Sequence, residues 1–571
     1  MKERPIVSTR KPIGIDWLLV YVSIRVRCDR MFIKSVRLRL ANRSRLTNTL
    51  TNEMGDMKEF KSSSELERHA TNDEGQVRDV SHRLVGLNVQ SEHARAMSGY
   101  ETISAGWVIC NSWVGIAATF ALAIAQGGPV SLIYGPIIMF LLVGACALTL
   151  AELASVYPTA GGQYHWTSIL SPKSSSRGLS YCCGATNVFA WIAICAGIAI
   201  IIPQQIMGMA VFYNPSYVPQ TWHAFILYQG GNLMVLVYNV YLLKRSMWIH
   251  DVGFIISISC FVTLVITSLA RTAPNFQPAK VVWTTFLNQS GWVDSVAFLT
   301  GLVNSNYMYA GIGGVIHLAE ECKNAAMVVP RALMSTIAIG FVTSFVFAIV
   351  MVYCTNDFDA AVSTPTSVPI YEIWRQATRS DAAATVYLVF LLLMAFFALN
   401  GAQQTASRLS WSFARDNAIF GSRWLSKISP TQDVPIAALV FNFAIMFVIG
   451  CIYLGSSSAF NAFIGTGLIL QHLTYAMPAA LLMYRGRSSA WLPQTRSFKL
   501  PSWLGWTANV TTVGFAIFVL VIYCFPVAMP VSGSNMNYAS AVIAVMALFA
   551  TLNWFFYARK NYQGPRLEFS D

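Results

Sequence analysis

Residues 304–332 place groups that could bind a ligand inside an otherwise apolar region. The stretch begins with polar and aromatic residues, continues with closely spaced glycines and ends in a charged run. Glycine weakens a helix and lets a ligand or another backbone approach closely. In lipid, a broken helix is tolerated where its freed N–H and C=O groups face protein or water. The stretch therefore predicts a ligand site built partly from backbone groups, although the same glycines also suit close helix packing. The candidate ligand-binding residues are Tyr307, Tyr309, Ala310, Gly311 and Gly313.

A second stretch, at residues 103–119, has the same character. Asn111 and Ser112 lie in the middle of an apolar run beside Trp113 and Gly115, and we include all four in the predicted ligand site. Aromatic faces attract ammonium groups, and a helix N-terminus attracts a carboxylate. Two such interrupted stretches in one chain favour a membrane transporter that binds its substrate at the interruptions.

Charged and amide side chains lie at further points in the apolar regions. Glu152 is costly in lipid and needs a partner or water. Glu320, Glu321 and Arg331 follow the glycines, and we expect one of these carboxylates to pair with an arginine and act as a gate. A solvated charge run that only sets topology is the alternative. Asn400 belongs to a polar helical face that lines a pathway or makes interhelical hydrogen bonds.

Composition identifies the elements that must position these residues. The chain has 571 residues, of which 55% are hydrophobic and 11% charged, whereas soluble domains average about 25% charged residues. Apolar runs of about 20 residues recur, each long enough to cross a bilayer. The net charge of +13 comes from a leader and short loops, which indicates membrane topology rather than nucleic-acid binding. The cysteines have no metal-ligand spacing, so neither a metal nor a cofactor is predicted.

Twelve membrane spans are expected, and the first and sixth contain the two stretches. Only Arg271, Lys280, Arg375 and Arg379 fall in loops that this count places outside, which predicts cytoplasmic N- and C-termini. Polar, Gly-interrupted spans at positions one and six predict a five-plus-five inverted repeat. The expected spans are 103–125, 131–155, 186–211, 224–243, 251–270, 295–319, 335–354, 384–408, 435–454, 459–484, 503–526 and 538–557.

The chain divides into four expected regions. Residues 1–99 form a polar, largely disordered cytoplasmic leader, and 100–484 form a ten-helix transport core. Residues 485–560 add two transmembrane helices, and 561–571 form a cytoplasmic tail. A second interpretation of the leader starts translation at Met54 or Met57.

Five motifs together resemble the amino acid–polyamine–organocation permeases, most closely the fungal branch that includes choline and 4-aminobutyrate permeases. The resemblance covers about residues 98–560 in colinear order. The motifs are Gly-Gly-Pro-Val at 127–130, Pro-Thr-Ala-Gly-Gly-Gln-Tyr-His-Trp at 158–166, His-Leu-Ala-Glu-Glu at 317–321, Pro-Arg-Ala at 330–332, and Ser-Arg with Phe-Ala-Arg-Asp at 407–416.

The resemblance implies an all-α polytopic membrane protein of about twelve helices. It implies a five-plus-five inverted-repeat core with broken helices one and six, and a substrate held at the breaks. It also implies secondary active transport of an amino acid or small amine with protons as the coupling ion, and location in the plasma membrane or an internal membrane such as the vacuole. Relatives often have an acidic residue where this chain has Gly313, so the headgroup contact differs here.

Three alternatives remain open at this stage. A non-transporting nutrient sensor would use the same fold, with the leader as its signalling part. A transporter of a specialised metabolite would fit the loss of the acid at Gly313. A membrane-embedded enzyme would need convergent carboxylates or histidines within the spans, which the sequence does not supply. The glycines lack the strand–turn–helix context of a phosphate-binding loop, which argues against ATP-driven transport. The partners expected are a small-molecule substrate and the lipid bilayer; the oligomeric state is not predicted.

Overall fold

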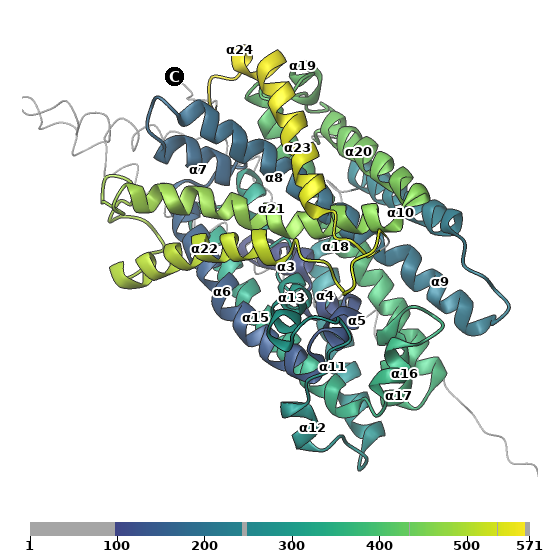
Figure 1. Cartoon of the computed structure of the whole chain (residues 1–571). Helices are drawn as coiled ribbons and strands as arrows, with labels where there is room; N and C mark the ends of the chain where they lie inside the picture. Colours follow the sequence, from purple (N-terminus) through teal and green to yellow (C-terminus); the bar gives the residue numbers. More distant parts are fainter. Residues whose placement is uncertain (1–96, 243–247, 433, 534, 566–571) are drawn as a thin grey trace, which may run out of the picture. The chain divides into compact units, whose positions relative to one another are not determined.

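The computed structural model describes residues 97–565 except 243–247, 433 and 534 (Figure 1). The chain separates into two units, Met1–Asp79 and Val80–Asp571, and the described residues all belong to the second. The predicted leader and the end of the predicted tail therefore lie outside the described residues.

Helices occupy the position of every predicted span. Eight of the helices in the described part are long and apolar enough to cross a membrane, which makes the chain an all-α, multi-pass membrane protein. The total of twelve crossings stays a prediction, because spans one and six are interrupted and α10 and α21 are less apolar. The long helices are α6 (Gly128–Val156), α8 (Ser176–Ala199), α9 (Ile201–Tyr213), α10 (Thr221–Tyr241), α11 (Ile249–Thr272), α15 (Ala325–Cys354), α18 (Asp381–Arg415), α20 (Ile436–Gly455), α21 (Ser457–Tyr484), α22 (Ser502–Ile522) and α23 (Ala539–Asn553).

Shorter helices build the interrupted spans and the connections. The first span consists of α3 (Gly99–Cys110), α4 (Ser112–Ala118) and α5 (Phe120–Ala125), and the sixth of α13 (Asp294–Tyr307) and α14 (Gly314–His317) followed by the 3₁₀ turn η2 (Ala319–Glu321). The remaining short elements are α7 (Gln163–Leu170), α12 (Ala279–Thr284), α16 (Phe358–Val362), α17 (Pro369–Thr378), α19 (Ser422–Leu425), η3 (Trp554–Ala558) and α24 (Arg559–Asn561).

Local signals in the sequence explain where several helices begin. Ser98 and Glu101 form a capping box at the start of α3, each side chain bonding the backbone N–H of the other. Gly127 has φ of 110° before α6, and Pro129 follows in the first turn, where its missing N–H costs no hydrogen bond. The Ser380 side chain caps α18 by accepting from the Ala383 N–H.

The helix contacts repeat when each of the first five spans is exchanged with the span five positions later. Helix α3 packs on α15 as α13 packs on α6, and α11 packs on α18 as α21 packs on α8. Likewise α10 packs on α18 as α20 packs on α8. This pairing is what two similar five-helix halves would produce, and it supports the predicted five-plus-five core. Helices α22 and α23 pack on α21, outside that pattern (Figure 1).

Candidate substrate site and inner gate

The first span breaks at Asn111. This residue adopts a left-handed conformation with φ of 36° and ψ of 64° between α3 and α4, so its backbone leaves the helical path. Asparagine is one of the few residues that visits this conformation readily. The side chains of Asn111 and Ser112 are buried, and the Asn111 Nδ2 and Ser112 Oγ atoms have no hydrogen-bond partner among the described residues.

The sixth span breaks at residues 308–313, which form turns between α13 and α14. Gly311 has φ of 85°, a conformation that other residues rarely adopt. The Gly311 N–H donates to Gln471 Oε1 at 3.4 Å, and the Gly313 N–H donates to the Tyr475 hydroxyl at 3.1 Å. Side chains of α21 therefore satisfy donors that the missing helical turn would leave unpaired.

The two breaks lie against each other. A Cβ at Gly115 would lie 2.8 Å from the Tyr307 carbonyl oxygen, so only glycine permits this approach. Asn304 also joins the two spans, because its Nδ2 donates to Thr119 Oγ1 at 2.7 Å. Spans one and six are therefore in direct contact through α4 and α13, next to their two breaks.

A wall of α8 and α3 faces the glycines of the sixth span. A Cβ added at Gly311 would lie 2.9 Å from Ile109 Cγ2 and 3.4 Å from the Trp191 ring. A Cβ at Gly314 would meet the same two side chains at 2.9 and 3.0 Å. The ring of Trp191 also meets the His317 ring edge to face, with centroids 5.9 Å apart. Trp191 is therefore the tryptophan that these contacts place beside the break.

A buried polar cluster lies next to Gly313. The Asn187 Nδ2 donates to Gln163 Oε1 at 3.0 Å and lies 3.4 Å from His317 Nε2, while His317 Nδ1 donates to the Ala160 carbonyl at 2.8 Å. The Gln163 Nε2 has no partner among the described residues and would lie 3.2 Å from a Cβ at Gly313. A buried amide donor without a partner at this point is suited to donate a hydrogen bond to a ligand oxygen.

Two ion pairs close the inner end of the sixth span against α18. Arg408 Nε lies 2.5 Å from Glu321 Oε1, and Arg415 Nη2 lies 3.4 Å from Glu320 Oε1. Glu320 also accepts from the Ala160 N–H at 3.2 Å. We call Glu320, Glu321, Arg408 and Arg415 the inner gate. It joins a segment that directly follows a broken helix to the continuous helix α18.

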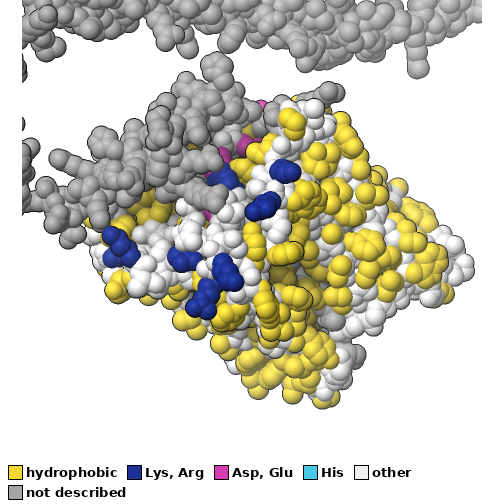
Figure 2. Space-filling view, turned by 90° about the horizontal axis from the view of Figure 1, so that it is seen from above, with side chains coloured by type: hydrophobic (Ala, Val, Ile, Leu, Met, Phe, Trp, Pro, Cys, Tyr) yellow, Lys and Arg dark blue, Asp and Glu magenta, His cyan; other side chains and the backbone are white. Residues whose placement is uncertain are grey.

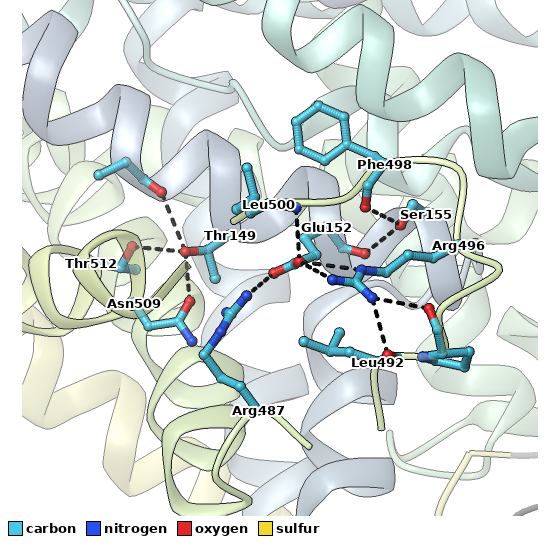
Figure 3. A network of polar contacts seen from close by, with 12 residues as sticks. Thr149, Glu152, Ser155, Arg487, Leu492, Arg496, Phe498, Leu500, Asn509 and Thr512 are labelled. Carbon is cyan, nitrogen blue, oxygen red and sulfur yellow. Dashed lines mark hydrogen bonds and ion pairs between the residues drawn. The ribbon is translucent and has the colours of Figure 1, made fainter. Parts of the chain in front are cut away.

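A second ionic cluster lies at the end of α6 (Figure 3). Glu152 is completely buried, and its carboxylate contacts Arg487 Nη2 at 2.5 Å and Arg496 Nη2 at 3.0 Å. It also accepts from the Leu500 N–H at 3.3 Å. We call Glu152, Arg487 and Arg496 the Glu152 triad. Both arginines come from the connection between α21 and α22, so the triad fastens that connection to α6.

Comparison with known proteins agrees with this architecture. The profile of the family described as amino acid permease matches residues 100–549. The chain belongs to the amino acid permease family. A choline transporter from Saccharomyces cerevisiae is 32% identical over 472 residues, 82% of either chain. A swainsonine transporter from Arthroderma benhamiae is 32% identical over 83% of this permease and 93% of that protein. A 7-keto 8-aminopelargonic acid transporter from Saccharomyces cerevisiae is 28% identical over 76% and 87%, respectively.

These similarities settle the class of protein. The resemblance to fungal amino acid and choline permeases is confirmed, and the permease is a transmembrane transporter rather than an enzyme. Among the described residues, no group of three or more His, Cys, Asp or Glu side chains is arranged to hold a metal ion.

The predicted aromatic residues of the permease occupy different positions around the breaks. Trp113 is fully buried, and its Nε1 donates to Ser257 Oγ at 3.0 Å, which in turn donates to Asn111 Oδ1 at 2.9 Å. The Tyr309 hydroxyl donates to the Ile337 carbonyl at 3.0 Å. Tyr307 is half-buried, as is Ala310. Substrate contacts by these residues stay predictions, and hydrogen bonds already hold Trp113 and Tyr309 in place.

Neither Asn400 nor Arg331 has a hydrogen bond or ion pair with the two breaks or the gate residues among the described contacts. Asn400 accepts a hydrogen bond from Asn239 of α10 at 2.8 Å, and Gln403 likewise donates to Asn232 of α10 at 2.6 Å. This is the interhelical bonding that was the alternative to a pathway role, so the substrate contact of Asn400 stays a prediction. Arg331 is exposed on α15, and the arginines that pair with Glu320 and Glu321 come from α18 instead.

Sequence reasoning missed Trp191, Gln471, Tyr475 and Gln163 as residues around the break. The sequence offered a signal for two of them: Gln471 and Tyr475 are polar side chains within an apolar span, and such side chains need a hydrogen-bond partner there. Trp191 gave no such signal, because a tryptophan in an apolar helix most often packs in the core.

Proposed function

We propose that this permease is a secondary active transporter that imports a small amine or amino acid, such as choline or 4-aminobutyrate, together with protons. The observation that carries the proposal is that two spans, broken at Asn111 and at residues 308–313, approach each other next to these breaks at Gly115 and Tyr307, with Trp191 close to the second break. Irregular backbone within a membrane protein is expected where it lines a substrate cavity. The inner gate then supplies a closure on one side of that site.

The side chains around the break favour a substrate bound without a counter-ion. Trp191, Gln163, Gln471 and Tyr475 are neutral, and Gly313 stands where relatives often have an acid. An ammonium group is attracted by an aromatic face, whereas amide donors bind a carboxylate or carbonyl. We therefore place the ammonium group toward Trp191 and the polar end of the substrate toward Gln163.

The distribution of charge supports cytoplasmic termini. Lys and Arg side chains gather on the face seen in Figure 2, which is the end of the helices where α7, α19 and α24 lie in Figure 1. Cytoplasmic loops carry the excess of basic residues in membrane proteins. We place this face in the cytoplasm and the permease in the plasma membrane.

Radiolabelled uptake tests the proposal directly. A host that lacks its own permeases would express the full chain and receive choline, 4-aminobutyrate, basic and neutral amino acids, and polyamines. We expect accumulation of one class, abolished by a protonophore. The matched control is Gly311→Val, because a side chain at φ of 85° and 2.9 Å from Ile109 would disturb the break without touching the gate. Normal surface delivery without accumulation of any compound would favour the nutrient sensor.

Gly313→Asp tests where the substrate lies. A carboxylate at this position would have two hydrogen-bond donors, the Tyr475 hydroxyl and the unpaired Gln163 Nε2. The Tyr475 side chain would have to move slightly, because its hydroxyl would lie only 2.8 Å from the new Cβ. We expect the preference of the permease to move toward cationic amines by about tenfold, which corresponds to about 1.4 kcal/mol. Unchanged competition between choline and neutral amino acids at normal surface expression would place the substrate elsewhere. A specialised metabolite, suggested by the swainsonine transporter among the relatives, is tested by adding swainsonine to the panel, and its accumulation without that of choline or amino acids would identify this substrate class.

A further inference from the structure

His250 occupies a buried position where three helices meet. It lies at the start of α11 and is 2% exposed. Its Nε2 lies 3.0 Å from Gln404 Oε1 of α18. Gly401, one turn before Gln404, leaves room for the ring, since a Cβ there would lie 3.4 Å from His250 Cε1 and 2.7 Å from Ile109 of α3.

A short chain of hydrogen bonds connects this histidine to the inner gate. Gln404 accepts from His250 through Oε1 and donates from Nε2 to Glu321 Oε2 at 3.4 Å. Glu321 is held from the other side by Arg408. In this arrangement the His250 Nε2 keeps its hydrogen in both protonation states, so the proton that comes and goes is on Nδ1. The bond to Gln404 therefore persists through protonation.

The charged groups that act on His250 come from each element packed around it. Glu321 belongs to η2, Glu101 to α3 and Asp251 to α11, and all three are acidic. Arg408 of α18 stands behind Glu321. Of the three carboxylates, Glu321 alone belongs to the inner gate. Opening the gate would therefore change the electrostatic surroundings of His250 by removing a negative charge.

The other buried histidines lack this connection. His317 donates from Nδ1 to the Ala160 carbonyl and has Nε2 facing Asn187, which fixes the neutral form. His472 contacts Asn306. His165 lies 3.4 Å from Asp416, a pair that includes none of the gate residues. His250 is thus the buried histidine that reaches a gate carboxylate through a side chain, Gln404, whereas His317 reaches Glu320 only through the Ala160 backbone.

We propose that His250 is the proton-binding residue of transport and that closure of the inner gate raises its affinity for protons. This inference rests on the proposed function, because a proton-binding residue couples transport only if the permease imports its substrate together with protons. A carboxylate near an imidazole favours the charged imidazolium. With the gate closed, Glu321 supports a proton taken up from outside. When the gate opens, Glu321 moves away and the proton is released to the cytoplasm, which is the order that proton-driven import requires.

Linkage makes the proposal testable without knowing the substrate. If gate closure strengthens proton binding, then proton binding must favour gate closure by the same factor. An opposite charge at short range commonly changes proton affinity by a factor of about ten or more. We therefore expect acid to shift the gate toward the closed state by about tenfold. Substituting His250 with a neutral residue should remove this shift.

Cys322 provides a reporter beside Glu321. It is fully buried with the gate closed, and its Sγ donates to the Leu318 carbonyl at 3.2 Å. The full-length chain with Cys28, Cys182 and Cys451 replaced by serine would be labelled with a methanethiosulfonate reagent from the cytoplasmic side of inside-out vesicles. Labelling rates are compared between about pH 5.5 and pH 8, the range in which histidine titrates. The ionisation of the thiol itself affects all variants alike, so the ratio between variants isolates the gate.

The informative variant is His250→Gln, which keeps a neutral hydrogen-bonding side chain next to Gln404. We expect it to label about tenfold faster than the parent at acidic pH and at a similar rate at alkaline pH. The matched control is His223→Gln, since His223 bonds Tyr217 and the Gln220 N–H at the opposite end of α10 from the gate. A ratio of His250→Gln to parent that is constant across this pH range would overturn the proposal.

Glu321→Gln supplies a second variant if His250→Gln does not reach the membrane. It should also remove the acid-induced slowing, and the double variant should have the same pH dependence as Glu321→Gln alone, because both changes remove the same interaction between His250 and Glu321. Additive effects in the double variant would contradict a direct coupling between His250 and Glu321. Suppose that the ratio of the His250→Gln labelling rate to the parent rate does not change with pH while uptake in the substrate panel is driven by protons. That result would reject this inference and leave the proposed function intact. A ratio that changes with pH, in a protein that takes up no compound, would reject the transport proposal and keep the gate as a pH sensor.

Discussion

The inner gate and the Glu152 triad use the same two residue types for different purposes. In the gate, Glu320 and Glu321 each pair with one arginine, and their side chains are 38% and 27% exposed. In the triad, Glu152 is 0% exposed and lies between two arginines that are 4% and 8% exposed. The gate carboxylates belong to a 3₁₀ turn after a broken helix, whereas Glu152 belongs to an unbroken helix.

The difference in burial determines which pair can open and close. The gate pairs are partly exposed, with Arg408 at 10% and Arg415 at 20%. An ion pair becomes weaker as water reaches it, toward the roughly 0–1 kcal/mol of a fully exposed pair, so a substrate can break the gate pairs more easily than the triad. Removing one partner of a buried pair costs about 3–5 kcal/mol, because the remaining charge is left in a medium of low polarity. The gate is therefore suited to a reversible step, and the triad is suited to holding α6 and the α21–α22 connection together throughout transport.

The largest effect is expected from Glu152→Gln. This change leaves two buried guanidinium groups facing each other without a carboxylate, and we expect a loss of about 3–5 kcal/mol of stability. Gly505 allows Arg487 to lie at this position, since a Cβ there would come within 2.0 Å of Arg487 Nη2. Thermal unfolding of the purified protein in detergent, followed by size-exclusion fluorescence, would measure the change.

The matched control for Glu152→Gln is Glu372→Gln, which removes a carboxylate from a pair with Arg375 on the surface of α17. We expect this control to change the unfolding temperature very little. If the two variants unfold at the same temperature, the triad is no stronger than a surface pair and the contrast with the gate fails.

A smaller and different effect is expected from Glu321→Gln. Losing the bond to Arg408 removes about 0.2–1 kcal/mol from the closed state, which changes the turnover rate by a factor of about 1.4 to 5 while the apparent affinity stays the same. Arg408→Gln should act in the same direction. Initial uptake rates over a range of substrate concentrations would separate the two constants. A change confined to apparent affinity would place Glu321 in substrate binding rather than in the gate.

The sequence predicted those parts of this arrangement that depend on local residue types. Glycines 311 and 313 marked the sixth-span break, and at Gly311 few other residues would allow the φ of 85°. Asn111 marked the first break as a polar residue inside an apolar run. Both gate carboxylates were also predicted, since charges at the end of a membrane helix need a partner or water.

The partners of these residues could not be predicted, because they come from distant parts of the chain. Glu152 meets Arg487 and Arg496 across more than three hundred residues, and both arginines resembled ordinary basic loop residues. Gln471 and Tyr475, which accept hydrogen bonds from the backbone of the broken span, also lie far from it in the sequence. Residue type gives a need for a partner, and only the packing of helices determines which residue meets that need.

The smallest effect is expected from Glu320→Gln. Its pair with Arg415 is longer, at 3.4 Å, and its side chain is the more exposed of the two gate carboxylates. A glutamine keeps an oxygen that can accept from the Ala160 N–H, so the contact with residues 158–166 would survive. We expect uptake to change less than twofold and to become less sensitive to salt, because exposed charges are screened by ions. Glu320→Ala removes that acceptor as well, and a larger loss in this variant would show that Glu320 acts through the Ala160 backbone. If Glu320→Gln and Glu320→Ala both lose as much uptake as Glu321→Gln, the two gate pairs work as one unit. The exposed fraction of each carboxylate would then not predict the size of its effect.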